Sequence, residues 1–232
     1  MFFSPPRSNP DKLFHPAVKK LFGDTEKNLV LLLANQNNVC YNKILKYKCP
    51  EKITMKISEL DKSQYDYYVL HYRYITDSHY VVSQNSDKNS FSVKFERQDY
   101  KTPVTVENED TLFQDYWKYP EAYGLEDENG NLVGFLELDF EDWNSRVRIT
   151  QLLIDESLRR KGYGKMLMDF AKDIAKDRDY RMLILETQSR NTPAIDFYLS
   201  QGFVFSGTNL HFYSNDDISE DEVMLELAYF ID

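Results

Sequence analysis

The stretch "RRKGYGKML", residues 159–167, decides the fold of this chain. It holds two glycines separated by one residue, four cationic side chains around them, and apolar residues that continue at helical spacing. The first N–H groups of a helix carry partial positive charge, and glycine lets a bound group approach the backbone closely. The stretch therefore predicts a pyrophosphate site at the start of a helix. Taken alone, it also fits a simple turn with solvated cations.

The stretch lacks the defining features of two common nucleotide loops. No third glycine follows at the dinucleotide spacing, where Met166 and Leu167 stand instead. No Gly-Lys-Ser/Thr sequence is present either. These differences argue against nicotinamide dinucleotides and nucleoside triphosphates as ligands.

The elements around this stretch alternate between strands and helices. Apolar patterning predicts a strand over 146–154, a helix over 163–177 and a buried central strand over 181–187. A second helix is predicted to begin at Thr192, whose hydroxyl caps it ahead of a proline, and to end at Gly202. The apolar stripe of the first helix consists of Tyr163, Leu167, Phe170, Ala171, Ile174 and Ala175.

Two hairpins are predicted before the strand at 146–154. Residues 122–140 read as strand, turn, strand, with Asn129-Gly130 supplying the positive φ angles of a type I′ turn. The second hairpin turns across 141–145. Together they indicate a largely antiparallel group of strands.

The first half of the chain is patterned less regularly. We expect a mainly helical N-terminal extension over 1–50 and a single domain over 51–232. Within that domain, a helix opened by Asp61 is predicted over 61–74 and a short helix over 110–119. The other expected strands lie over 53–57, 91–95, 203–207 and 222–230.

The charge balance points to the kind of substrate. The formal net charge is −10, which disfavours nucleic acid and suits a small cationic substrate. Cys40 and Cys49 do not have metal or redox spacing, and the four histidines are scattered, so we predict no metal site. The N-terminus lacks a signal-peptide pattern, and the longest apolar run, 29–34, is shorter than the roughly 20 residues that span a bilayer. We expect a soluble cytoplasmic protein with no membrane contact.

Two motifs resemble one enzyme family. The pattern Arg159-x-x-Gly162-x-Gly164 after "LLIDESL" resembles the acyl-CoA pyrophosphate loop of the GNAT N-acetyltransferase superfamily. The segment 189–203, "SRNTPAIDFYLSQGF", is similar to the next motif of that family. Its matching residues are Asn191, Ala194, Phe197, Tyr198, Gly202 and Phe203. The resemblance covers about 130–232, and two motifs in the right order are far more specific than either alone.

A narrower resemblance concerns one branch of the superfamily. The segments "LETQSRNTPAIDFY", "DWN" and "SEDEVMLELAYF" look like the streptothricin acetyltransferases, which act on a polycationic antibiotic. The acidic net charge agrees with such a substrate.

The resemblance implies an α/β (α+β) fold with a mixed, mostly antiparallel central sheet, flanked by helices and splayed between its fourth and fifth strands. Acetyl-CoA is implied in that gap as cosubstrate, with its pantetheine arm along strand 146–154. An N–H of residue 152 or 153 is implied to bind the thioester oxygen. The implied cofactor-binding residues are Leu152, Leu153, Ile154, Arg159, Arg160, Lys161, Gly162, Tyr163, Gly164, Lys165 and Asn191.

The identity of the general base stays open. An alkyl ammonium titrates near 10.4, so it must lose a proton before it attacks the thioester. Many relatives use a glutamate on the fourth strand, where this chain has Thr150 and Gln151. Glu186 is the candidate base, because a charge in an apolar strand is costly without a partner. Other nearby acids are Glu137, Asp139, Glu141 and Asp142, which are alternatively solvent-facing hairpin residues.

Three further side chains each have a possible functional role and a structural alternative. Tyr198 resembles the family's general acid toward the CoA thiolate, or it is a packed helix tyrosine. Asn191 is expected to bond pantetheine or to be an ordinary turn residue. Trp143 could stack on a cationic acceptor or serve the core. Glu137, Asp139 and Trp143 make up the expected substrate-binding set.

The sequence thus predicts an acetyl-CoA-dependent N-acetyltransferase that transfers acetyl directly to a primary amine of a small cationic substrate. A streptothricin-like antibiotic is the sharpest version. The alternatives are acetylation of a protein or peptide amine, and a non-catalytic acyl-CoA-binding module. The oligomeric state is open, with a homodimer as one outcome.

Overall fold

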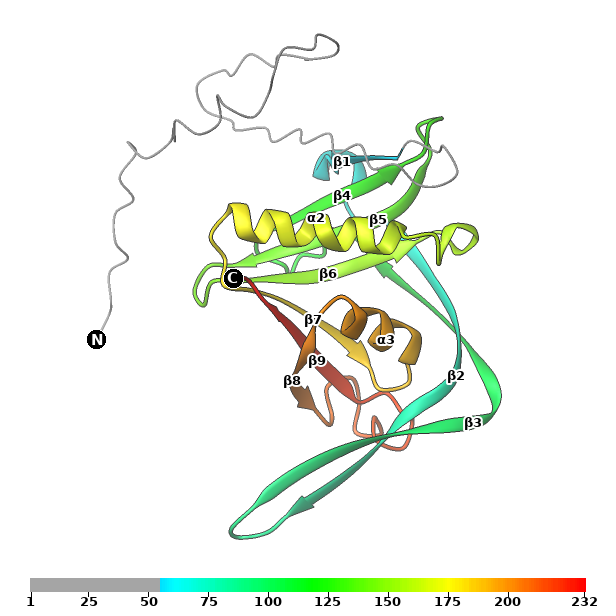
Figure 1. Cartoon of the computed structure of the whole chain (residues 1–232), viewed down its shortest axis with the longest axis vertical. Helices are drawn as coiled ribbons and strands as arrows, with labels where there is room; N and C mark the ends of the chain where they lie inside the picture. The colour runs from blue at the N-terminus through cyan, green and yellow to red at the C-terminus, as the bar shows by residue number, and fades with distance from the viewer. Residues whose placement is uncertain (1–54) are drawn as a thin grey trace, which may run out of the picture. The chain divides into compact units, whose positions relative to one another are not determined.

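The computed structural model describes residues 55–232, so the helical extension predicted over 1–50 lies outside the described residues. A seven-stranded sheet in the order β1-β4-β5-β6-β7-β9-β8 forms the centre of the domain (Figure 1). Its strands are β1 Lys56–Leu60, β4 Pro120–Glu126, β5 Leu132–Glu141, β6 Arg146–Ile154, β7 Met182–Gln188, β8 Val204–Asn209 and β9 Met224–Phe230. Only the β6–β7 pair is parallel. The predicted mixed, mostly antiparallel sheet is confirmed.

The sheet splits between β6 and β7. The two strands pair from Arg146 with Met182 to Ile149 with Leu185, and no further. Beyond that point the rest of β6 stays paired with β5, and the rest of β7 stays paired with β9. Beyond Ile149 and Leu185 the facing edges of β6 and β7 therefore do not pair with each other. This separation is the predicted splay of the sheet.

Two helices cover one face of the sheet (Figure 1). Helix α2, Tyr163–Asp177, has the predicted bounds, and its predicted stripe is buried except for the half-buried Ile174. Helix α3, Thr192–Ser200, follows β7. Both helices pack on a core that includes Leu136, Leu138 and other alternate residues of β5 and β6. The intervening residues of those strands therefore face the opposite side of the sheet.

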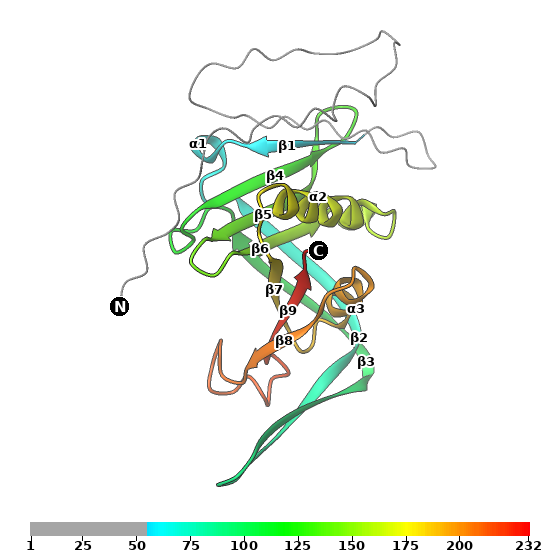
Figure 2. The same ribbon diagram turned by 60° about the vertical axis from the view of Figure 1, so that its left-hand side comes forward.

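A long two-stranded ribbon forms a sheet separate from the central one. It consists of β2, Val69–Ser86, and β3, Phe91–Thr111, paired antiparallel along their length. In both views the ribbon passes α3 and continues beyond β8 and β9 (Figures 1 and 2). This ribbon replaces most of the helix predicted over 61–74, of which only the single turn α1, Lys62–Tyr65, forms after its Asp61 cap. The alternation of Leu70, Tyr72 and Tyr74 has the period of a strand.

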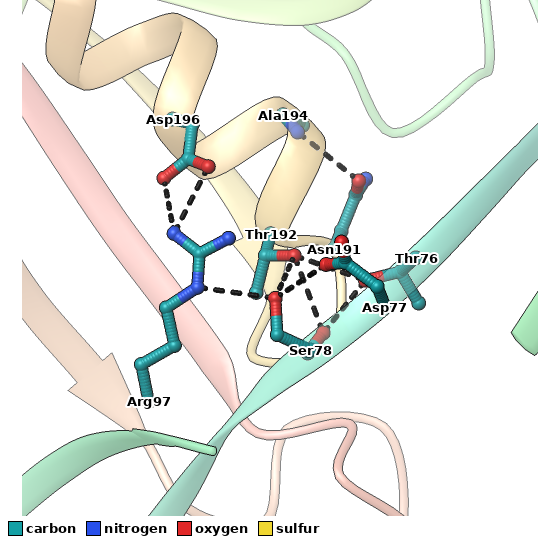
Figure 3. Close-up of polar contacts among 8 residues, drawn as sticks. All are labelled: Thr76, Asp77, Ser78, Arg97, Asn191, Thr192, Ala194 and Asp196. Atoms are coloured by element: carbon teal, nitrogen blue, oxygen red, sulfur yellow. Dashed lines mark hydrogen bonds and ion pairs between the residues drawn. The ribbon is translucent and has the colours of Figure 1, made fainter. Parts of the chain in front are cut away.

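The ribbon is fastened to the start of α3 by polar side chains (Figure 3). Thr192 Oγ1 lies 2.9 Å from Thr76 Oγ1 and 3.1 Å from Ser78 Oγ, and all three residues are buried. Arg97 of β3 donates to both carboxylate oxygens of Asp196 on the exposed side of α3, at 2.8 and 3.0 Å. We call this group of five residues the ribbon latch.

The same contacts correct the predicted cap of α3. Thr192 is the first residue of the helix, and its hydroxyl serves the latch. The cap is Asn191, whose side-chain oxygen accepts a hydrogen bond from Ala194 N–H at 3.3 Å. The predicted end of the helix at Gly202 fits its left-handed φ of 87°.

The helix predicted over 110–119 is wrong. Phe113 adopts a left-handed φ of 57°, which a helix does not allow. Its N–H donates to Glu137 at 2.5 Å, and Tyr119 N–H donates to Asp139 at 2.7 Å. Because these backbone groups bond to carboxylates of β5, the segment 112–119 lies along the sheet as a series of turns.

The turn predicted at Asn129-Gly130 is also different from a type I′ turn. Among the described residues of this loop only Gly130 has a positive φ, 82°. The Asp127 carboxylate accepts hydrogen bonds from the N–H groups of Asn129 and Asn131. The loop that connects β4 and β5 is therefore built around the Asp127 side chain and is longer than the two-residue loop of a type I′ hairpin.

No helix within residues 55–232 combines the length and the apolar character needed to cross a membrane.

Candidate functional site

A cleft of about 460 Å³ opens where β6 and β7 separate. One wall is the end of β6, a second is the start of α2, a third is α3, and the ribbon closes the fourth. Its lining residues are Tyr72, Arg73, Tyr74, Leu152, Leu153, Ile154, Arg159, Arg160, Gly162, Gly164, Lys165, Asn191, Pro193, Ala194, Phe197 and Tyr198. The structure thus brings most of the predicted cofactor-binding residues into one cavity.

The glycine loop forms the α2 end of the cleft. Gly162 caps α2 with a φ of 91°, and a Cβ at this position would meet no atom within 4 Å. The first helical hydrogen bond runs from Met166 N–H to Gly162 O, so the amides of Gly164 and Lys165 lie ahead of it. Gly164 faces the Phe197 ring of α3, which a Cβ there would contact at 3.4 Å. This geometry fits a diphosphate at the helix start.

The predicted cations surround this loop with different partners. Arg159 donates to the carbonyl of Ile154 at 3.0 Å and to that of Arg73, so it ties the end of β6 to the ribbon. Lys165 pairs with Asp169 at 2.8 Å in an exposed ion pair. Arg160 is exposed at the rim with a left-handed φ of 62°. Lys161 is also exposed, whereas the Tyr163 side chain is buried in the core.

The β6 wall presents backbone to the cleft. Leu152 and Ile154 pack their side chains against the α2 core, and Leu153 packs on the other face. Since β7 no longer pairs with these residues, the edge of β6 that faces β7 is open to an added extended chain.

Tyr198 and Asn191 project from α3 toward the same cavity. Burial raises the pKa of the half-buried Tyr198 phenol to about 12, which keeps it protonated at neutral pH. Asn191 caps the helix, and its side chain lines the cleft beside Pro193.

Carboxylates gather on the face of the sheet opposite α2. Glu186 is the first residue of β7 after the last β6–β7 pair, and burial raises its pKa. Tyr213 O–H donates to it at 3.4 Å. Burial also raises the pKa of Tyr116, and the negative charges of Asp110, Glu137 and Glu186 add to that rise. These three carboxylates therefore share one neighbourhood beside Tyr116.

Glu137 and Asp139 are buried rather than solvent-facing. Glu137 accepts from Thr150 Oγ1 at 2.6 Å as well as from Phe113 N–H, and burial raises its pKa. Asp139 accepts from Tyr119 N–H. Both carboxylates thus hold the 112–119 segment against β5. Of the other hairpin acids, Glu141 pairs with Arg146 and Arg148, and Asp142 accepts from Tyr180.

Trp143 is not brought to the cleft. It is 83% exposed in the loop between β5 and β6, at the opposite end of β6 from the glycine loop. Arg146 lies over its ring at 5.9 Å.

The ribbon residues of the cleft were missed by the sequence reasoning. Tyr72, Arg73 and Tyr74 all come from β2. The alternating pattern of 70–74 could have indicated a strand, but nothing local could have indicated that this strand crosses the cleft. Within residues 55–232 no group of three or more His, Cys, Asp or Glu side chains could hold a metal ion.

Comparisons with known proteins agree with this geometry. Residues 91–203 match the acetyltransferase (GNAT) family. The streptothricin acetyltransferase of Streptomyces lavendulae is 36% identical over 100 residues, 43% of this chain and 52% of that protein. The corresponding protein of Escherichia coli is 34% identical over 99 residues, 43% of this chain and 56% of that one. The chain thus spans about half the length of these curated relatives.

Solved structures share the fold. A nourseothricin acetyltransferase superposes with a TM-score of 0.61 at 20% identity, covering 77% of this chain and 99% of that one. A putative streptothricin acetyltransferase from Bacillus anthracis, solved with acetyl coenzyme A, gives a TM-score of 0.57 at 23% identity, covering 77% and 98%.

Proposed function

We propose that the protein is an acetyl-CoA-dependent N-acetyltransferase acting on a primary amine of a small cationic substrate, since residues 91–203 match the acetyltransferase (GNAT) family. The observation that carries the proposal is a single cavity with an anion-binding helix start at one end and Tyr198 in its wall. The transfer is direct, within a ternary complex of both substrates.

The glycine loop is proposed to hold the diphosphate of coenzyme A. The N–H groups of Gly164 and Lys165 and the guanidinium of Arg160 supply the positive charge. The open edge of β6 over Leu152–Ile154 pairs with the pantetheine arm as an added strand would. When bound, acetyl-CoA supplies the activated acyl group.

Glu186 and Tyr198 are assigned the proton transfers of the reaction. Glu186, directly or through water, takes a proton from the substrate ammonium, and the freed amine forms the new C–N bond. The C–S bond breaks, Tyr198 donates its proton to the departing thiolate, and the second proton that the nitrogen loses on forming the amide returns to the phenolate. The products are an N-acetyl amine and coenzyme A, with one proton released overall from the ammonium substrate.

The acceptor is proposed to enter from the face opposite α2. The carboxylates of Asp110, Glu137 and Glu186 give this face a negative potential around the exposed Tyr116. Such a surface attracts a polycation, which supports a streptothricin-like substrate, as the names of the relatives suggest.

An acceptor screen tests the proposal. Free thiol released from acetyl-CoA is followed with streptothricin, aminoglycosides, polyamines and peptides as acceptors. Release with a small polycation is the expected result. Release only with peptides would favour a protein acetyltransferase. Tight CoA binding without release would favour the acyl-CoA-binding module, which the absence of a carboxylate at Thr150 and Gln151 would then explain.

A further inference from the structure

Besides Tyr198, two tyrosines of β2, Tyr72 and Tyr74, line the cleft. Tyr72, on β2 of the ribbon, faces the cavity together with Leu152 and Tyr198. The assignments made so far for the reaction do not use it. Its phenol donates a hydrogen bond to the side-chain oxygen of Gln151 on β6 at 2.5 Å. A short contact of this kind fixes the hydroxyl at the edge of β6.

The hydroxyl also meets the backbone of the same strand. Burial raises the pKa of Tyr72, and the nearby phenol of Tyr198 adds to that rise, while a backbone hydrogen bond at Leu152 opposes it. The Leu152 N–H is one of the two amides expected to bind the thioester oxygen. Tyr72 therefore stands beside the place where negative charge would develop during acyl transfer.

We propose that Tyr72 is a catalytic residue whose hydroxyl, next to the Leu152 N–H, donates a second hydrogen bond to the acyl oxygen of the thioester. This rests on the proposed function, since it concerns the same cleft and the same acyl donor. No covalent bond forms to Tyr72, and its proton stays on the phenol oxygen throughout.

A turn of the Gln151 amide frees the phenol proton. In the structure the Gln151 oxygen accepts from Tyr72, and its nitrogen makes only a 3.5 Å contact with the carbonyl of Thr111. If the amide turns over, its N–H donates to the phenol oxygen, and the phenol proton points into the cleft. The turn reverses the direction of the Tyr72–Gln151 hydrogen bond, gives up the long contact to Thr111 and brings the Gln151 oxygen toward the Thr111 carbonyl. The hydrogen bonds that Tyr72 and the Leu152 N–H then donate to the acyl oxygen offset this cost.

A donor in this position acts mainly on the transition state. The acyl oxygen becomes more negative as the amine adds, so a fixed hydrogen bond strengthens during the reaction. Removing one such donor lowers kcat by about 10² to 10³-fold in other acyl-transfer enzymes. Tyr72 thereby has a role separate from that of Tyr198, which is assigned to the leaving thiolate.

The direct test is the carbonyl stretch of bound acetyl-CoA, labelled with ¹³C at the acyl carbon and measured by infrared difference spectroscopy. Hydrogen bonding to the acyl oxygen lowers this frequency. We expect the bound frequency to be lower in the wild type than in Tyr72→Phe. Tyr80→Phe, a ribbon substitution outside the cleft, is the matched control and should leave the frequency at the wild-type value.

Two further readouts separate a donor from a packing residue. Tyr72→Phe should lower kcat by about a hundredfold or more, with acetyl-CoA affinity within about twofold of the wild type, a factor worth only about 0.4 kcal/mol. Gln151→Glu should lower kcat in the same way, because a carboxylate can only accept and keeps the phenol proton on itself. Increased turnover in Gln151→Glu would instead identify position 151 as a base and overturn the proposal.

The infrared measurement needs no acceptor amine, so its result does not depend on whether the protein acetylates one. An unchanged carbonyl frequency in Tyr72→Phe would overturn the role of Tyr72 even if the wild type acetylates amines rapidly. A frequency difference in a protein that acetylates no amine would support the Tyr72 contact and count against the proposed function. A wild type that does not bind acetyl-CoA would overturn both.

Discussion

Tyr198 illustrates how one residue combines packing with chemistry. Its ring packs against Phe197 and Phe203 in the α3 core, while the residue also lines the cleft. The pKa raised to about 12 keeps the phenol protonated at neutral pH. Its proton is therefore available to the thiolate as negative charge develops on the leaving sulfur.

Replacement of Tyr198 by phenylalanine should keep the packing and remove the proton. We expect kcat to fall by about 10² to 10⁴-fold, the usual contribution of a general acid, while acetyl-CoA affinity by calorimetry stays close to the wild-type value. Steady-state kinetics with a saturating amine measure the first quantity. Full turnover in this variant would remove the acid role from Tyr198.

Replacement of Glu186 by glutamine is predicted to lower activity but to raise stability at neutral pH. Burial raises the pKa of Glu186, and Arg148 lowers it by a smaller amount. As the base, Glu186 must be ionised, so turnover should rise with pH through a pKa above the ordinary value of 4.5. Glu186→Gln should abolish this limb of the kcat profile and lower kcat by about a hundredfold or more. A variant with wild-type turnover and the same acid limb would exclude Glu186 as the base.

The same shift has a stability consequence of defined sign. A carboxyl whose pKa is raised in the folded state favours folding below its unfolded pKa, and this contribution is lost as pH rises through the folded pKa. Glu186→Gln removes the burial of a charge at neutral pH. Chemical denaturation should therefore show its stability, relative to the wild type, to be greater at pH 7 than at pH 4. The opposite order would mean that the ionised carboxylate is better stabilised than its burial suggests.

At the level of elements, the ribbon latch connects β2 and β3 to α3. Its two parts differ in burial, and this decides their weight. The Thr192 hydroxyl is buried among Thr76 and Ser78, whereas the Arg97–Asp196 pair is 41% and 50% exposed. Exposed ion pairs contribute about 0–1 kcal/mol, while a buried polar group left without its partner costs about 1–3 kcal/mol.

Thr192→Val should therefore destabilise the domain more than Asp196→Asn does; Arg97 is left in place because its Nε also donates to the Ser78 hydroxyl, at 3.1 Å. Denaturant titration of the two variants gives the comparison, with expected losses of about 1–3 and at most about 1 kcal/mol, respectively. Because the latch holds the strand that carries Tyr72, Thr192→Val should also lower kcat at temperatures where it stays folded. Equal stability losses in both variants would contradict the ranking by burial.

The success of sequence-based prediction differed between elements for physical reasons. The strand at 146–154 and the helix at 163–177 have the predicted bounds, because their periodicity and flanking residues act locally. The segments 61–74 and 110–119 were predicted as helices, but only the single turn Lys62–Tyr65 is helical. Their backbone groups bond to distant partners, such as the β5 carboxylates that hold Phe113 and Tyr119, and no local pattern reveals these partners.

The candidate site divides in the same way. The glycine loop, Asn191 and Tyr198 were found because each belongs to a motif with fixed spacing. The β2 wall was missed because Tyr72 lies far from those motifs in sequence and reaches the cleft only through the ribbon. Trp143 was included because its ring could stack on a cationic acceptor, yet the sheet carries it to the other end of β6.

At the level of the whole molecule, charge is divided between the two sides of the cleft. The cations of the glycine loop and the ribbon surround the α2 end, although the chain carries a net charge of −10. The carboxylates around Tyr116 lie on the opposite face. This arrangement suits an anionic acyl donor on one side and a cationic acceptor on the other.

Salt should therefore weaken the binding of a polycationic acceptor. We expect its KM to rise as ionic strength increases from about 0.01 to 0.15 M, where the screening length falls from about 30 to 8 Å. Initial rates at saturating acetyl-CoA measure the effect, and a monoamine acceptor should respond less. A KM that does not change with salt would contradict an electrostatic acceptor site.

The central claim is that the start of α2 binds the diphosphate of coenzyme A, and calorimetry of acetyl-CoA binding to Gly162→Val tests it most directly. Gly130→Val is the matched control, since both glycines have a positive φ and open space at the Cβ position, but only Gly162 lines the cleft. We predict that Gly162→Val loses measurable binding while Gly130→Val, checked for folding in the same way, binds like the wild type. Wild-type affinity in a folded Gly162→Val would contradict the claim.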